Sequence, residues 1–293
     1  PLCREHLFSP PFSVFSFSLC FLPISLFVSC VVDPPVFSFH KTESAFDNET
    51  SATPRGLSEV INHMSIHKIE SLLWFTRMCS VVFTLLYIIP LLDANPYTCY
   101  QRALISNAAT SALRLHQRMP SIQLSRMFLS QLLIEDSCHY LFYSLIFLFA
   151  QPMTLVLLPV FLFSLLHSAS FSLILLDKFG GRSGVLGTWL VNLLDHQGRN
   201  ILRLVAFTEI FLMPLTVFSV LSGRSSLLTP FVYYRFLSLR YASRRNPYTR
   251  TVFHELRLVT EHYASRPGCP AFLRNLLHKT ITVLSQLSPP VPQ

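Results

Sequence analysis

The feature that most constrains this chain is a run of forty residues, from Ser137 to Leu176, without a single Asp, Glu, Lys or Arg. A helix that crosses a bilayer needs about 20 apolar residues. Forty residues are too many for one such helix and fit two, joined at Gln151-Pro152, because proline interrupts a helix. The sequence therefore predicts a membrane protein that contains a helical hairpin.

The two arms of this hairpin are predicted to be unequal. The first arm, 137–150, would be about 21 Å long at 1.5 Å per residue, whereas the hydrocarbon core of a bilayer is about 30 Å thick. The second arm, 153–176, is long enough to cross. A hairpin with one short arm can enter one leaflet and leave by the same face. It then occupies more area in that leaflet than in the other, which is a physical route to bending a membrane.

Two further apolar segments flank the hairpin. The segment Leu72–Leu92 is the first predicted span, and Arg77, one turn inside it, is expected to reach the interface beside Trp74. The segment Ile201–Ser222 is the third apolar stretch and contains Glu209. The predicted fold class is an all-α membrane protein with three to four hydrophobic helices, including the asymmetric hairpin, plus amphipathic interfacial helices.

The predicted organisation is a leader over 1–63, a multi-pass membrane domain over 64–241 and a tail over 242–293. Within residues 7–29, nineteen of 23 residues are Phe, Leu, Ser or Pro. These are the amino acids that all-pyrimidine codons encode, so the leader is interpreted as a non-native translated tract; a targeting segment or a further span are the alternatives. Residues 33–62 are polar and are expected to be disordered.

The positive charge of the chain lies at its C-terminal end. From residue 223 onward there are ten Lys and Arg against two acids, and the rest of the chain has 13 of each. A basic tail after membrane spans indicates the cytosol and an anionic membrane surface. Nucleic acid is the competing partner for such a tail. It is disfavoured, because the bases alternate with helical apolar stripes.

The tail is predicted to form two amphipathic helices that lie in the headgroup plane. Asn246 is the expected N-cap of the first helix, and Pro267 and Pro270 separate it from the second. The alternative is that the two apolar stripes pack as an ordinary core. The bases expected at the membrane surface are Arg244, Arg245, Arg250, Arg257, Arg274 and Lys279.

The loop 93–134 is expected to hold an amphipathic helix over 101–119. Its predicted apolar face comprises Leu104, Ala108, Ala112, Leu115 and Met119, and its small residues 106–112 favour docking of a partner helix. A generic helix in which alanine supports helix propensity is the alternative. This loop is also net positive, so the positive-inside rule places it on the same side as the tail. Four crossings would separate the two segments, whereas three would not. We therefore expect three crossings and a cytosolic tail.

The sequence offers little that is typical of an enzyme. The seven cysteines show no metal-ligand or disulfide spacing, and there is no HExxH or GxSxG motif. No catalytic residue, metal or cofactor is therefore predicted. Glu209 is the principal intramembrane charge; it is interpreted as a structural ion pair with Arg203 or Arg77, and an ion pathway is the alternative.

Two other patterns carry competing interpretations. The neighbouring Glu135, Asp136 and His139 could hold a metal or exchange protons, but polar residues also end a span at the membrane edge. The glycines at 180–187 could cradle a phosphate, but the GxGxxG spacing is absent and a flexible turn is expected.

Three blocks of the chain, 101–147, 209–223 and 230–250, closely resemble the transmembrane protein 33 family, also called the Krüppel homologue 2 family, which includes yeast pore-membrane proteins. The resemblance begins near Ile66. It covers Glu209 at the family's charged intramembrane position and Arg244–Tyr248 in its Arg-Arg-Asn-Pro-Tyr block. It offers no catalytic residues.

The resemblance implies a non-enzymatic protein of the endoplasmic reticulum and nuclear envelope. Its implied partners are the lipid bilayer, reticulon-type membrane proteins that organise tubular reticulum, nuclear pore components and further copies of itself, but not nucleic acid. The alternative function is that of an accessory regulator of a reticulum ion channel or of stress signalling.

Overall fold

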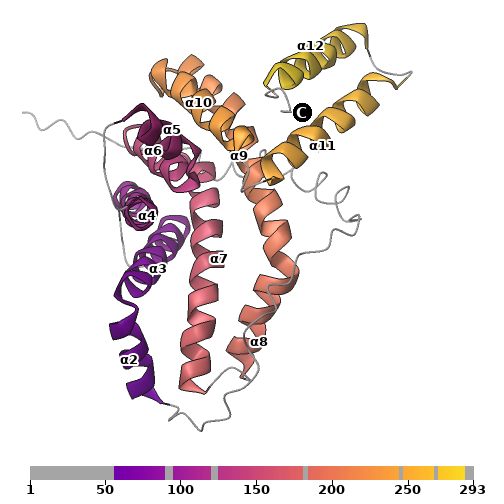
Figure 1. Ribbon diagram of the computed structural model, residues 1–293. Helices are drawn as coiled ribbons and strands as arrows, with labels where there is room; N and C mark the ends of the chain where they lie inside the picture. The colour runs from indigo at the N-terminus through magenta and orange to yellow at the C-terminus, as the bar shows by residue number, and fades with distance from the viewer. Residues whose placement is uncertain are drawn as a thin grey trace, which may run out of the picture. The chain divides into compact units, whose positions relative to one another are not determined.

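The computed structural model describes residues 56–89, 95–119, 125–180, 184–243, 247–266 and 270–287. These residues belong to one compact unit and contain no strand, so the predicted all-α fold is confirmed (Figure 1). The leader up to residue 55, with its apolar tract, lies outside the described residues. The helices are α2 (Leu57–Ile66), α3 (Lys68–Ile88), α4 (Pro96–Arg118), α5 (Arg126–Ile134), α6 (Asp136–Leu148), α7 (Thr154–Phe179), α8 (Val185–Asn192), α9 (Gly198–Leu221), α10 (Leu228–Ala242), α11 (Tyr248–Ala264) and α12 (Ala271–Leu287).

Three helical segments in the described part of the chain are long and apolar enough to cross a bilayer. They are α3 with 21 residues, α7 with 26 residues, and the continuous segment Val185–Leu221 with 37 residues. A short π-helical turn, Leu193–Gln197, joins α8 to α9 within the third segment. All three exceed the length of about 20 residues that a crossing needs. They correspond to the three predicted apolar regions.

The predicted hairpin is present, and its arms are unequal. Helix α6 has 13 residues and α7 has 26, with the break at Phe149–Met153 around Gln151-Pro152. Helix α6 is therefore about 20 Å long, too short for a hydrocarbon core of about 30 Å. The arms meet through side chains: the hydroxyl of Tyr143 donates to the carbonyl of Val156 over 2.8 Å.

Hydrogen bonds between small and aromatic polar side chains align α3 with α7 and α4. Trp74 Nε1 donates to Ser172 Oγ at 2.9 Å, and near the other end of α3 the hydroxyl of Tyr87 lies 3.1 Å from that of Thr154. The two helices are consequently antiparallel. Thr110 on α4 donates to Thr76 on α3 over 2.9 Å. Hydrogen bonds of this kind hold helices together where apolar burial gives little driving force.

The apolar face predicted for 101–119 is wrong in part. Helix α4 buries Leu104 as expected but exposes Ala112, while Asn107 and Ser111 are buried instead. Asn107 donates to Ser144 on α6 over 2.8 Å, and α4 packs between α3 and α6. Within 106–112, Asn107, Thr110 and Ser111 therefore pack against helices of this same chain, whereas Ala109 and Ala112 are exposed.

Two segments expected to be irregular are helical. Gly187, predicted in a loop, lies inside α8, and the glycine that ends α7 is Gly180, with a left-handed φ of 87°. Helix α2 begins at Leu57, within the segment expected to be a disordered leader, and packs against α7. The membrane-embedded unit thus starts before residue 64.

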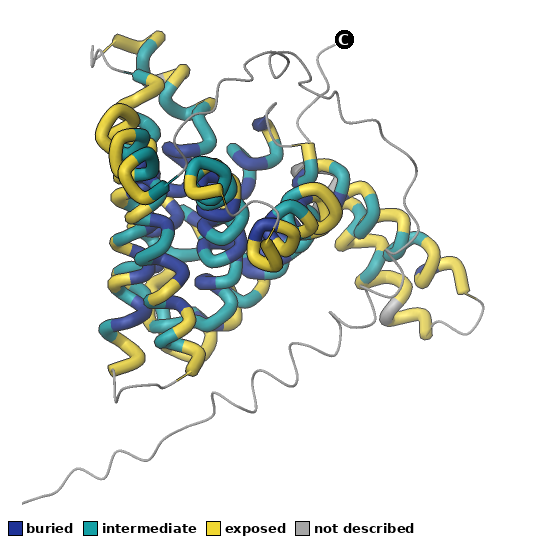
Figure 2. Tube along the Cα trace, turned by 90° about the horizontal axis from the view of Figure 1, so that it is seen from below, coloured by how far each residue is buried: buried dark blue, intermediate teal, exposed yellow. Residues whose placement is uncertain are grey.

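The two C-terminal helices are present, and the first one packs on the third span. Helix α11 begins at Tyr248, one residue later than predicted, and Asn246 lies outside the described residues. Val252 and Phe253 are buried, and α11 contacts α9 and α12. Helix α12 is mostly exposed (Figure 2). The alternative that the apolar stripes of the tail pack as an ordinary core therefore applies to part of the stripe on α11.

Large apolar side chains cover the outside of the spans. In a water-soluble protein such a surface would be a liability, but in a bilayer it is the expected lipid-facing surface. The residues with this exposure include Phe75, Val82, Leu85, Ile174, Leu186, Trp189, Val217, Phe218 and Leu221.

Three crossings make a prediction about sidedness. N-glycosylation sequons can be engineered one at a time near residues 96, 182 and 290, in an Asn48→Gln background that removes the native sequon. Glycosylation in microsomes then shows on which side of the membrane each position lies. Positions 96 and 290 should share one side and 182 should lie on the other, because two crossings separate 96 from 290. Unlike states at 96 and 290 would contradict three crossings.

Candidate functional site: a buried ion-pair network and the cavity beside it

Glu209 lies in the third span and is fully buried, with 0% of its surface exposed. Its Oε2 lies 3.1 Å from Nε of Arg240, which is 1% exposed, and its Oε1 accepts a hydrogen bond from the hydroxyl of Tyr140. Its backbone carbonyl accepts a hydrogen bond of 2.7 Å from Tyr233. One glutamate thus connects α9 with α6 and α10.

A second carboxylate extends this network to the start of α6. Asp136 Oδ1 lies 3.4 Å from Nη1 of Arg240 and accepts a 2.9 Å hydrogen bond from Ser243. Burial by itself lowers the pKa of Arg240, but Glu209, Tyr140 and Asp136 more than offset it and raise the pKa above its ordinary value. The guanidinium is therefore charged.

Neither predicted partner of Glu209 is the observed one. Arg203 instead pairs with Glu255 on α11 at 3.1 Å, and Arg77 lines a cavity between other helices. The actual partner, Arg240, is one of the ten bases from residue 223 onward and is not among the predicted site residues. The sequence carries a signal for it: Tyr233, Phe236, Leu237 and Arg240 share one helical face, and all are buried. An arginine that continues an apolar stripe is a candidate for a buried pair.

In the cluster of Glu135, Asp136 and His139, Nδ1 of His139 lies 3.7 Å from Oδ1 of Asp136, and the other contacts are made with residues outside the cluster. Glu135 pairs with Arg118 at the end of α4 over 2.5 Å, and Nε2 of His139 lies 2.7 Å from the carbonyl of Leu133. Within the described ranges no group of three His, Cys, Asp or Glu side chains is placed to hold a metal. These residues close the junction between α5, α6 and α4.

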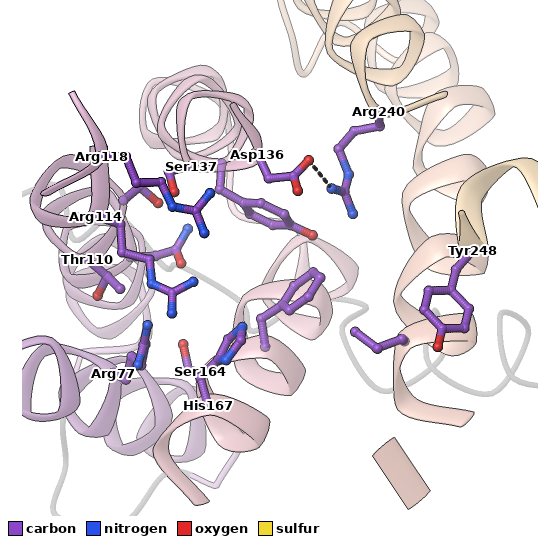
Figure 3. Close-up of a pocket in the computed structure, with 15 residues that line it drawn as sticks. Arg77, Thr110, Arg114, Arg118, Asp136, Ser137, Ser164, His167, Arg240 and Tyr248 are labelled. Carbon is purple, nitrogen blue, oxygen red and sulfur yellow. Dashed lines mark hydrogen bonds and ion pairs between the residues drawn. The ribbon is translucent and has the colours of Figure 1, made fainter. Parts of the chain in front are cut away.

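Beside the network lies a cavity of about 310 Å³. Residues from α3, α4, α6, α7, α9, α10 and α11 line it. Figure 3 shows the side chains of Arg77, Arg114, Arg118, Ser164 and His167 converging on this space. The prediction that Arg77 reaches the membrane interface is wrong: it is 7% exposed, because the side of α3 that carries it packs against α4 and α7.

The cavity is strongly basic. Arg118 is balanced by Glu135, and Arg240 by Glu209 and Asp136. Among the described residues, neither Arg77 nor Arg114 has an ion-pair partner. Burial, followed by the charge of Arg118, lowers the pKa of Arg114. Buried Arg77 and half-buried Arg114 thus face one cavity without a carboxylate of their own.

The six predicted surface bases of the tail have different environments. Arg244 and Arg245 lie outside the described residues. Arg250 donates to the carbonyl of Ser243 over 3.3 Å, and Arg257 pairs with Glu261 at 2.8 Å. Arg274 and Lys279 are exposed on α12. None of the four described bases lines the cavity.

The buried pair makes a prediction about stability. Arg240→Met should lower the free energy of unfolding by about 3–5 kcal/mol, because it leaves Glu209 buried and unpaired. The double variant Glu209→Leu/Arg240→Met should recover much of that loss. Thermal and denaturant unfolding of the purified chain in detergent measures both effects.

The matched control is the partly exposed pair of Arg203 and Glu255. Because solvent screens it, Arg203→Met should cost about 0–1 kcal/mol. Equal losses from Arg203→Met and Arg240→Met would contradict a special role for the buried pair.

Comparison with known proteins places the chain among integral membrane proteins. The family model described as "Transmembrane protein 33/Nucleoporin POM33" matches residues 52–290, so the match begins before the predicted boundary at residue 63. Transmembrane protein 33 of Homo sapiens is 50% identical over 240 residues, which are 82% of this chain and 97% of the relative. No solved structure matches the chain.

More distant relatives carry the same family names. Krueppel homolog 2 of Drosophila melanogaster is 41% identical over 79% of this chain and 83% of its own length. The Transmembrane protein 33 homolog of Caenorhabditis elegans is 40% identical over 80% of this chain and 87% of its own length. The chain with the buried Glu209–Arg240 pair therefore belongs to the transmembrane protein 33/nucleoporin POM33 family.

Proposed function

We propose that this chain is a non-enzymatic membrane protein of the endoplasmic reticulum and nuclear envelope. In this proposal it organises tubular reticulum together with reticulon-type proteins and supports the organisation of nuclear pores. The nucleoporin in the family description supports the second role. The role in organising tubular reticulum is supported by one observation: three helical segments long enough to cross a bilayer occur together with two shorter helices, α6 and α10.

The short helices provide the mechanism. Helices α6 and α10 have 13 and 15 residues, so they are about 20 and 22 Å long against a hydrocarbon core of about 30 Å. Helix α6 packs on α4, helix α10 packs on α9, and the two short helices pack on each other. Aromatic rings fill the contact between them; the ring centroids of Tyr143 and Phe236, for example, are 5.2 Å apart. A rigid pair of half-length helices adds area to one leaflet, which favours curved membrane.

The orientation follows from charge. With three crossings the basic loop 93–134 and the basic C-terminal region share one side, which the positive-inside rule assigns to the cytosol. Helix α12 then adds a surface anchor on that side, since it exposes Phe272 and Leu276 beside the bases Arg274 and Lys279. Apolar and basic side chains together are what an interfacial helix uses to bind anionic lipid.

The alternative of a channel or stress-signalling accessory would give Glu209 a role in transport or regulation. Its carboxylate is engaged by Arg240 and Tyr140 and has no exposed surface. This geometry favours a structural role for Glu209.

Localisation tests the proposal directly. A fluorescent fusion of the full chain should be found on reticulum tubules and at the nuclear envelope, and should co-purify with a reticulon-type protein from detergent extracts. Exclusive localisation to flat reticulum sheets, without reticulon association, would contradict the organising role.

The contribution of α12 can be separated by mutation. Phe272→Glu/Leu276→Glu should reduce the fraction of protein on tubules, because it removes the exposed apolar side chains that enter the interface. The control Asn275→Glu/His278→Glu adds the same charge at exposed polar positions and should have a smaller effect. Quantitative imaging of both variants checks this; equal effects would show that charge alone is responsible.

A further inference from the structure

The arginine-lined cavity has the properties of an anion-binding site. Arg77 is more than nine-tenths buried, comes from the middle of α3 and reaches the cavity together with Arg114 of α4 (Figure 3). A buried charge is unfavourable unless it is paired, and within the described residues neither Arg77 nor half-buried Arg114 has a carboxylate partner. An anion in the cavity would compensate them.

The other lining residues offer neutral hydrogen-bonding groups. Ser111 and Ser164 are buried and have hydroxyls at the cavity wall, and His167 adds a ring nitrogen. In addition, Nη2 of Arg240 is buried without a hydrogen-bond partner among the described residues, although its other nitrogens bind Glu209 and Asp136. Arginine guanidinium groups and hydroxyl groups together are typical hydrogen-bond donors to phosphate groups in proteins.

The charge balance indicates the kind of anion. Two arginines remain after the internal pairs are assigned, and a phosphate monoester carries about 1.5 to 2 negative charges at neutral pH. A phosphodiester carries one charge and would leave one arginine uncompensated. A cavity of about 310 Å³ accommodates a phosphate group together with part of what it is attached to.

We propose that the cavity between α3, α4, α6 and α7 binds a phosphate monoester through Arg77 and Arg114, supplied either by a lipid headgroup such as phosphatidic acid or by a soluble phosphate. The site is separate from the proposed membrane-shaping role and does not depend on it. Bound anion would tie α3 and α4 to α7 as Glu209 ties α9 to α10.

The test uses the full chain in two settings. In nanodiscs of phosphatidylcholine, with or without phosphatidic acid, thermal unfolding and native mass spectrometry report on the lipid. In detergent, the unfolding temperature in inorganic phosphate is compared with that in chloride at equal ionic strength, which tests binding of a soluble anion. Binding to the folded state raises the unfolding temperature by mass action. A rise with phosphatidic acid alone identifies a lipid ligand, and a rise with inorganic phosphate as well identifies the phosphate group as sufficient; both support the site.

The decisive variant is Arg77→Gln/Arg114→Gln. Without anion it should unfold at a higher temperature than the native chain, because it removes the uncompensated charge of buried Arg77 and that of half-buried Arg114. With phosphatidic acid or phosphate its unfolding temperature should no longer rise. The control Arg224→Gln/Arg235→Gln removes two exposed arginines and should keep the full anion-dependent rise.

Two results would overturn the proposal. One is a native chain whose unfolding temperature responds to neither phosphatidic acid nor inorganic phosphate. The other is a cavity variant that is destabilised without anion and yet keeps the anion-dependent rise, since the arginines would then be structural and the anion would act elsewhere.

Discussion

The buried pair of Glu209 and Arg240 is the interaction on which the arrangement of the shorter helices depends. It lies where α6, α9 and α10 meet; Tyr140 donates a hydrogen bond to Glu209, and Asp136 lies 3.4 Å from Arg240. A buried ion pair is not a large net source of stability, but the loss of one partner is costly. The pair therefore specifies one arrangement: helices too short to cross a bilayer are held against a helical segment long and apolar enough to cross.

This arrangement connects the fold to the proposed function. Loosely attached half-length helices could tilt or leave the bilayer, and would then add little area to one leaflet. Fixed by the ion pair and by the aromatic contacts between α6 and α10, they form a wedge of constant shape. The same packing leaves a basic cavity beside the pair, so the wedge and the proposed anion site share Asp136, Tyr140 and Arg240.

Hydropathy and helix length were sufficient to predict the spans, the break at Gln151-Pro152 and the unequal arms, because these depend on local composition alone. The partner of Glu209 was not predictable in this way. Arg240 is 31 residues away on another helix, and only packing brings the two together. Arg77 was misplaced for a related reason: its distance from the helix end predicted exposure, whereas the face on which it lies decides burial. A search for arginines that continue an apolar stripe would have found Arg240.

The most direct measurement is hydrogen–deuterium exchange of the full chain in lipid nanodiscs, compared between the native sequence and Arg240→Met. If the ion pair holds the short helices, amides of α10 and of the first turns of α6 should exchange faster in the variant, while those of α3 and α7 remain protected. Unchanged protection of α10 and α6 in a folded Arg240→Met chain would contradict the account.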